Sequence, residues 1–140
     1  MQTVEKIINL NGGLEALKEK AIKVMNDPYM PLCIEYIGEG PRGLPTISVA
    51  HYYEQNGDLM RDPDMVFEIA NDSLEGYRWL PVSWQNDGLG INQYACWVST
   101  TGAIMIKTGL IKELTAFSKT WDKNLKNQGF EKAAALIVSV

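Results

Sequence analysis

The sequence predicts an α+β domain in which N-terminal and C-terminal helices pack on one face of an antiparallel sheet of about five or six strands, built from hairpins. Three observations predict it: helical periodicity at both ends of the chain, short alternating segments between them, and an Asn-Gly pair that joins two of those segments. With 140 residues, the chain has the length of one domain that buries its own core. We therefore expect a single domain, 1–140.

Two helical segments are expected before the first strand. The first, capped by Thr3, is interrupted at Gly12-Gly13, and the second ends at Asp27-Pro28 because the residue before a proline is disfavoured in a helix. The second segment is the longer one, and its apolar residues form a single stripe: Leu14, Leu17, Ala21, Val24 and Met25.

The segment Ile47–Ile69 predicts a hairpin that turns at Asn56-Gly57. Asn-Gly favours a type I′ turn, because both central residues of that turn need a positive φ. A two-residue loop then pairs His51 with Asp62, and the side-chain period of two places both on the same face as Tyr53.

Two prolines, Pro63 and Pro81, interrupt the predicted strands. Proline cannot donate to a ladder, so we expect a bulge, a break or an edge position at each of them. At Pro63, a bulge would re-aim the side chains of His51 and Asp62 toward a site. The alternative is a simple kink in an edge strand.

The remaining strands are expected at 32–37, 77–84 and 91–99, joined by turns rich in Gly, Asn and Asp, one of them at 71–76. Residues 102–110 fit either a last strand or the lead into a helix. The C-terminal helix then carries an apolar stripe and stops at 127–129, before a final short helix from Phe130. The stripe consists of Leu110, Leu114, Phe117, Trp121 and Leu125.

Charge and composition argue against several partners. A net charge of −4 and a pI near 5.0 do not provide the basic face that nucleic acids and anionic membranes require. No apolar run approaches the roughly 18 residues of a membrane helix, and the N-terminus lacks the basic and apolar regions of a secretory signal. We expect a cytoplasmic protein whose two cysteines, Cys33 and Cys96, are reduced.

The predicted hairpin carries several carboxylates and the single histidine of the chain, a combination that can bind a metal ion. Oxygen ligands together with a histidine suit a divalent metal. The spacing matches no EF-hand, however, and the lysine of a nuclease-type PD…ExK run is missing after Glu68. No other cofactor is expected. The candidate metal ligands are His51, Glu54, Asp62, Asp64 and Glu68, and the catalytic candidates among them are His51, Asp62 and Asp64.

Two other roles are open to His51. Ser48 or Ser83 would complete a Ser-His-Asp arrangement with Asp62, but no nucleophile elbow supports one. The structural role is that of a strand histidine hydrogen-bonded to Asp62, which would raise the pKa of the imidazole and orient its ring.

Aromatic residues in the strands suggest a protein-binding surface. Core packing accounts for most of these rings, but strand alternation leaves some on the less buried face, and exposed Trp and Tyr are common anchors of protein interfaces. A protein partner is therefore expected, and a homodimer stays open. The candidate binding residues are Tyr53, Trp79, Trp84 and Trp97.

The runs AHYYEQNGDLMRDPDMVFEI and WQNDGLGINQY together resemble an uncharacterised domain of bacterial mobile-element proteins, which occurs in plasmids, conjugative elements and phages. The resemblance covers residues 32–98 and leaves the helical ends out. It implies a bacterial accessory protein and brings no established activity. The positions that it singles out are His51, Glu54, Gln55, Asn56, Gly57, Asp58, Asp62, Pro63 and Asp64.

We therefore predict a non-enzymatic interaction module that binds a protein partner through an exposed face or edge of the sheet. The alternative is a metal-dependent hydrolase or nuclease that uses the carboxylates of the hairpin. That alternative requires at least three of the candidate ligands to converge in one cleft.

Overall fold

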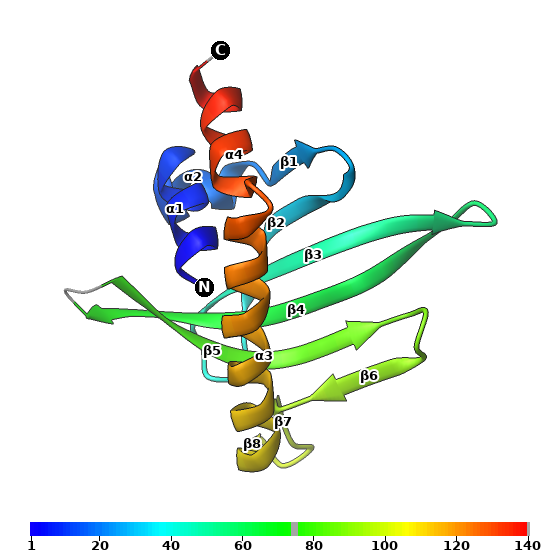
Figure 1. Ribbon diagram of the computed structural model, residues 1–140. Helices are drawn as coiled ribbons and strands as arrows, with labels where there is room; N and C mark the ends of the chain where they lie inside the picture. Colours follow the sequence, from blue (N-terminus) through cyan, green and yellow to red (C-terminus); the bar gives the residue numbers. More distant parts are fainter. Residues whose placement is uncertain (74–75, 140) are drawn as a thin grey trace.

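The computed structural model, which describes residues 1–73 and 76–139, contains a six-stranded antiparallel sheet, a two-stranded sheet and helices at both ends of the chain (Figure 1). The predicted α+β class is confirmed. Within the described residues, no helix is both long enough and apolar enough to cross a membrane. The elements in chain order are α1 (Gln2–Leu10), α2 (Gly13–Glu19), β1 (Ile22–Asn26), β2 (Tyr29–Glu39), β3 (Pro45–Gln55), β4 (Asp58–Ser73), β5 (Gly76–Asn86), β6 (Ile91–Tyr94), β7 (Cys96–Val98), β8 (Ile104–Ile106), α3 (Thr108–Asn127) and α4 (Phe130–Ser139).

The large sheet follows the order of the chain, β1 to β6, and every neighbouring pair is antiparallel. β1 and β6 are therefore its edges, and the β3–β4 hairpin lies at its centre. Pro63 in β4 and Pro81 in β5 are in interior strands, so the interpretation of Pro63 as a kink in an edge strand is wrong.

The central hairpin turns as predicted. Asn56 and Gly57 have φ values of 53° and 84°, as a type I′ turn requires, and Tyr53 is paired with Met60. The residues next to a turn of this kind set the register of the whole hairpin, which is why a local dipeptide fixes so much of the sheet.

Both prolines coincide with bulges. On β4, Asp62 and Pro63 together stand opposite His51, because Tyr52 pairs with Arg61 and Ala50 with Asp64. On β5, the register shifts beside Pro81 in the same way. The predicted bulges are confirmed, since proline has no N–H to give to the ladder and the extra residue absorbs the gap.

The predicted helix over Leu14–Met25 is wrong in its second half. α2 ends at Glu19, Lys20 is already extended, and residues 22–26 form the edge strand β1. Ile22 and Val24 satisfy both a helical stripe and a strand alternation, so the sequence pattern is ambiguous at this point. Pairing of β1 with β2 provides ladder hydrogen bonds that an exposed helical turn would not, and this decides the outcome.

Three further boundaries differ from expectation. The strand expected at 91–99 is divided at Ala95 into β6 of the large sheet and β7 of the small one, and 102–110 supplies both β8 and the start of α3. In the turn expected at 71–76, β4 continues to Ser73 and β5 starts at Gly76. Residues 74 and 75 lie outside the described residues.

One face of the large sheet carries the core, and the helices cover it. Figure 1 shows α3 lying across the sheet, with α1, α2 and α4 grouped near its C-terminal end. Alternate residues of β2, β3 and β4 are buried under these helices, as one-sided burial of an antiparallel sheet requires. The largest fully buried apolar side chains are Phe67, Phe130, Ile7, Ile8, Leu32, Ile34, Ile47, Met65, Ile69, Leu125 and Val4.

The two ends of the chain are joined by a cap. Asp122 on α3 accepts hydrogen bonds from the backbone N–H groups of Thr3, at 3.1 Å to each carboxylate oxygen, and of Val4, at 3.4 Å. These N–H groups belong to the first turn of α1, where no intrahelical acceptor exists. Thr3 is therefore not the cap that the sequence predicted; a carboxylate from the other end of the chain takes that role.

We expect Asp122→Ala to lower the free energy of unfolding by about 1 kcal/mol, because the first turn of α1 loses its acceptor. Urea unfolding measures the change. Asp122→Asn keeps an acceptor oxygen and should lose less, and Lys123→Ala on the exposed side of α3 should change nothing. Equal stability of the Ala variant and the wild type would contradict this role.

Candidate functional site

The predicted metal ligands lie on two faces of the sheet. Met65 and Phe67 are buried under the helices, so Asp64 and Glu68, which alternate with them, project from the opposite, helix-free face. His51 lies on the helix-covered side, where its ring is 5.6 Å from that of Trp121 and 5.7 Å from that of Phe130.

The remaining carboxylates of the hairpin also have separate surroundings. Asp62 accepts a hydrogen bond of 2.9 Å from the amide of Asn86, and Asp64 accepts one of 2.6 Å from the hydroxyl of Ser48. Glu54 is exposed near the turn. Across residues 1–73 and 76–139, no three His, Cys, Asp or Glu side chains gather closely enough to hold a metal ion. The convergence that a metal-dependent hydrolase requires is thus not found in the described part of the chain.

Glu68 is fully buried and supports a loop. Its carboxylate accepts a hydrogen bond of 2.8 Å from the Arg42 guanidinium and two more from the backbone N–H groups of Arg42 and Leu44, at 2.9 and 3.2 Å. Gly40 passes so close that a Cβ there would lie 2.5 Å from the side chain of Glu68. These contacts hold the Gly-rich loop against the helix-free face of the sheet, so Glu68 acts as an internal anchor.

His51 has a different partner from the one predicted. Its Nδ1 lies 3.0 Å from the carbonyl oxygen of Pro31, which makes Nδ1 the protonated nitrogen. Burial lowers the pKa of the imidazole below its ordinary 6.5, and the smaller effects of Pro31 and of the Asp62 charge oppose the shift without reversing it. The predicted rise of the pKa is wrong, because desolvation outweighs the nearby carboxylate.

A polar network joins the β3–β4 hairpin to the β5–β6 hairpin. The guanidinium of Arg61 on β4 binds both carboxylate oxygens of Asp87, at 2.9 and 2.7 Å, and also contacts the side-chain oxygen of Gln85. Gln85 in turn donates to Asn92 at 2.8 Å and to the hydroxyl of Tyr94 at 3.3 Å. The two sequence runs that carried the family resemblance therefore meet here, and the network positions the side chains of β6.

The surroundings of Asp87 and Asp64 shift the pKa values of these two carboxyl groups in opposite directions. Hydrogen bonds from Arg61 lower the pKa of Asp87 to about 2, so this carboxyl stays ionised near neutral pH. Burial raises the pKa of Asp64, against the hydrogen bond from Ser48 and the charge of Arg61. Both shifts have a structural explanation and need no bound ligand.

The four candidate binding aromatics have different environments. Trp79 packs edge-on against Phe67, and Trp84 packs edge-on against Phe117, so both belong to the helix-covered core. The Trp84 indole N–H is buried without an acceptor among the described residues. The hydroxyl of Tyr53 lies against the backbone of the neighbouring hairpin at residue 88.

Trp97 lines a groove of about 540 Å³ at the free edge of β6. β6 pairs only with β5, so its outer edge has unpaired backbone groups. The ammonium of Lys107 lies 5.6 Å from the centre of the Trp97 ring, a cation–π distance. The groove residues are Asn92, Gln93, Tyr94, Trp97, Lys107 and Leu110, and we call this site the Trp97 groove.

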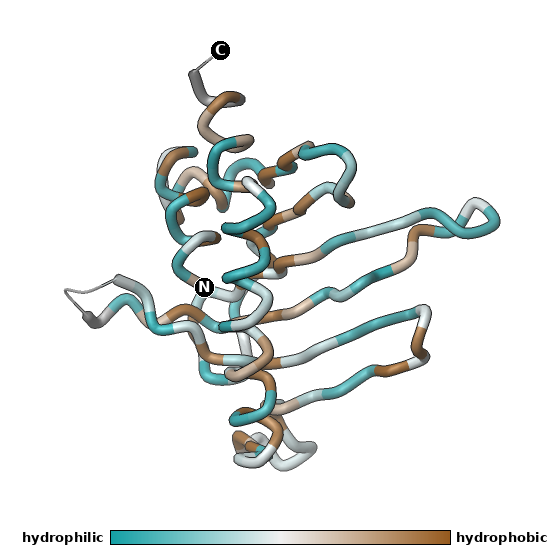
Figure 2. Tube along the Cα trace, in the orientation of Figure 1, coloured by the Kyte–Doolittle hydropathy of each residue, from teal (hydrophilic) through white to brown (hydrophobic). Residues whose placement is uncertain are grey.

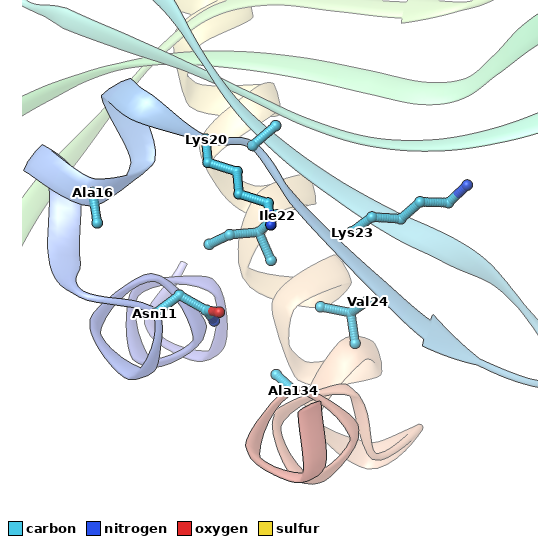
Figure 3. A pocket seen from close by; sticks show the side chains of 8 residues that line it. Asn11, Ala16, Lys20, Ile22, Lys23, Val24 and Ala134 are labelled. Carbon is cyan, nitrogen blue, oxygen red and sulfur yellow. The ribbon is translucent and has the colours of Figure 1, made fainter. Parts of the chain in front are cut away.

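Two other cavities lie on different parts of the described molecule. One of about 430 Å³ lies between α1, α2, β1 and α4, where Figure 3 shows Asn11, Ile22 and Ala134 around it. The amide of Asn11 already donates to the carbonyl of Ile7 at 2.8 Å. The other, of about 550 Å³, extends from Lys23 of the edge strand β1 across Glu35 of β2 to Tyr52 and Tyr53 of β3. Of these three cavities, the Trp97 groove is the one lined by a tryptophan.

Part of the groove escaped the sequence analysis. Trp97 was a candidate, but the other groove residues were not, and neither was Arg61, which supports β6 from β4. The similar turn sequences QNGDL at 55–59 and QNDGL at 85–89, with the opposite charges of Arg61 and Asp87 beside them, are the signal that could have suggested the bridge between the hairpins. Without the strand order, however, nothing in the sequence makes these turns neighbours.

The structure is that of a small α+β domain whose antiparallel sheet has an outer edge at β6, beside the Trp97 groove. A family model described as a domain of unknown function (DUF6908) matches residues 2–131, and the chain belongs to this family. The match takes in α1 and α3, so it extends beyond the residues 32–98 over which the sequence suggested a resemblance. Comparisons with curated proteins and with solved structures found no match.

We expect Glu68→Ala to lower the free energy of unfolding by about 3 kcal/mol, because the Arg42 guanidinium and two backbone N–H groups lose a buried partner. Chemical unfolding gives the value. Glu35→Ala, at an exposed carboxylate of the neighbouring strand β2, should have almost no effect. A Glu68→Ala variant as stable as Glu35→Ala would show that Glu68 does not anchor the loop.

The stability of the protein should fall as the pH drops from 7.5 to 5.5. The folded state lowers the pKa of His51 below the unfolded value of 6.5, so in this range the unfolded chain binds more protons and gains relative to the folded one. The same urea titration of His51→Gln should lose part of this slope, and the remainder comes from the α-amino group of Met1, whose pKa burial also lowers. The raised pKa of Asp64 acts with the opposite sign and at more acidic pH. An unchanged slope in His51→Gln would refute the assignment.

Proposed function

We propose that this domain is a non-enzymatic interaction module that binds a protein partner in the Trp97 groove. The observation that carries the proposal is the coincidence of an unpaired strand edge, β6, with an aromatic and aliphatic wall formed by Trp97 and Leu110. Extended peptides bind such edges by adding a strand, with affinity from backbone hydrogen bonds and specificity from neighbouring pockets. The sequence resemblance to mobile-element proteins supports a role as an accessory protein of a bacterial plasmid, conjugative element or phage.

The groove also suggests the chemistry of the bound segment. Lys107 is the one charged residue among those that line the groove, and its ammonium lies over the Trp97 ring. A segment with an apolar side chain for the Trp97–Leu110 wall and a carboxylate for Lys107 satisfies both. Asn92 and Tyr94 are held by Gln85, so the edge is preorganised, which reduces the entropy lost on binding.

The metal-dependent hydrolase or nuclease that the sequence left open gains no comparable support. Its candidate residues His51 and Asp64 lie on opposite faces of the sheet, and Glu68 is bound to Arg42. The interaction module is therefore the function that we carry forward.

The proposal is tested by placing a photo-crosslinking amino acid at Gln93, in the groove, and at Leu59, an exposed position near the turn of the central hairpin, in the native bacterium. We expect one protein to be crosslinked from position 93 and not from position 59. That protein is then purified and its dissociation constant measured by calorimetry. Identical crosslinked proteins from both positions would count against the groove.

Trp97→Ala should weaken the binding of this partner about 30-fold or more, because an aromatic anchor at the centre of an interface contributes roughly 2 kcal/mol or above. Leu59→Ser, which also removes an exposed apolar side chain, should leave the dissociation constant unchanged. Lys107→Ala should reduce the salt dependence of binding if an acidic residue of the partner contacts it. Unchanged affinity in Trp97→Ala would overturn the proposal.

A further inference from the structure

Of the four residues of β6, two present their backbone groups to the outer edge. The N–H of Ala95 donates to the carbonyl of Val82 at 2.7 Å, so these residues form a hydrogen-bonded pair that extends the β5–β6 ladder. Such pairs alternate with non-bonded ones in an antiparallel ladder, which turns the backbone groups of Gln93 toward β5. The N–H and C=O groups of Asn92 and Tyr94 therefore point outward, toward the Trp97 groove.

The open stretch of this edge stops at Tyr94. Both backbone groups of the next residue, Ala95, are in use, because its carbonyl accepts a hydrogen bond of 2.9 Å from the N–H of Lys107. That bond continues the pairing of β7 with β8, in which Cys96 stands opposite Ile106. Figure 1 shows β6 ending beside β7 and the first turn of α3. A strand added to β6 can therefore pair with it as far as Tyr94 and no farther.

The charge at this closed end is positive. Lys107 is the one charged residue that lines the groove, and its ammonium forms no ion pair with a carboxylate of the described residues. Residues 88–106, which precede it, contain no Asp, Glu, Lys or Arg. An anionic group of a bound segment is therefore attracted to this end of the groove, and a cationic group is repelled.

Apolar groups surround the same end. Trp97 and Leu110 are half-buried walls of the groove, and Figure 2 shows hydrophobic residues gathered around β7 and β8. Apolar walls exclude water, so a carboxylate beside Lys107 is screened less there than on an open polar surface.

We propose that the Trp97 groove binds the C-terminal end of its partner, which adds to β6 as a parallel strand and places its terminal carboxylate at Lys107. This proposal rests on the interaction function proposed for the groove and names the part of the partner that binds. A chain end added in the antiparallel direction would bring an α-ammonium to Lys107, so the charge selects the parallel direction. A chain that ends here also needs no room beyond Tyr94.

The parallel direction determines which backbone groups pair. The penultimate residue of the partner lies beside Gln93, donates its N–H to the carbonyl of Asn92 and accepts a hydrogen bond from the N–H of Tyr94. The last residue lies beside Tyr94, with its N–H directed away from β6. Its carboxylate is then level with the end of the open edge, where Lys107 lies.

The same register predicts the side chain of the penultimate residue. Gln93 is paired with Trp84, which packs on Phe117 of α3, so a side chain beside Gln93 lies on the helix-covered face. Leu110 of α3 lines the groove on this side. We therefore expect an apolar penultimate residue, because side chains next to an added strand provide its specificity.

Two phage libraries of the same short random peptides test the proposal on the purified full chain. In one library the peptides end in a free carboxylate at the C-terminus of a coat protein, and in the other they are followed by a linker and the coat protein. Binders retained by Trp97→Ala are discarded, and Leu59→Ser serves as the control that should retain them. We expect enrichment from the free-carboxylate library alone, with apolar penultimate residues.

The outcomes separate this proposal from the interaction function itself. Equal or better enrichment from the internal library would overturn capture of a C-terminus and leave partner binding in the groove standing. No enrichment from either library would also overturn it, whereas the interaction function is decided by crosslinking from Gln93.

The place of the carboxylate is tested by calorimetry with an enriched peptide. Amidation of its C-terminus should weaken binding about 10-fold or more, because a charge-assisted contact is lost. Lys107→Gln should weaken the free peptide to a similar extent and make amidation almost without further effect. Lys112→Gln, at an exposed position of α3, should behave as the wild type. An equal effect of amidation in Lys107→Gln and in the wild type would contradict the contact.

The register is tested by N-methylation of the same peptide. A methyl group on the penultimate nitrogen removes the donor to the Asn92 carbonyl and should weaken binding about 5-fold or more. Methylation of the last nitrogen, which is directed away from β6, should have little effect. The reverse pattern would overturn the parallel pairing.

Discussion

The apolar face of the six-stranded sheet imposes the main constraint on this fold, because it must be covered and none of the described residues between β1 and β6 forms a helix. The cover therefore comes from both ends of the chain. Asp122 ties α1 to α3, and the rings of Trp121 and Phe130 close over His51. With the helices all on this side, the outer strands β1 and β6 each keep one edge without a ladder partner among the described residues.

The polar network around Arg61 holds two hairpins of the sheet together. The β3–β4 and β5–β6 hairpins extend beyond the helical cover, where apolar packing no longer holds them together. There, Arg61 joins the hairpins through hydrogen bonds to Asp87 and Gln85. Gln85 in turn donates a hydrogen bond to Asn92 of β6. A bidentate guanidinium–carboxylate pair suits this position because its geometry fixes orientation even in contact with solvent. The HYYEQNGDLMRDPDM run is thereby part of the scaffold of the Trp97 groove.

The sequence was sufficient wherever local chemistry decides the structure. Asn56-Gly57 fixed the central turn, Pro63 required a bulge, and the stripe from Leu110 to Leu125 specified α3. The sequence was insufficient where a helical stripe and a strand alternation fit the same residues, as at Ile22 and Val24. There, the pairing with β2 makes β1 a strand. The site depends still more on distant contacts. Trp97 could be proposed from alternation, but Arg61 and Lys107 acquire their roles only through strand order.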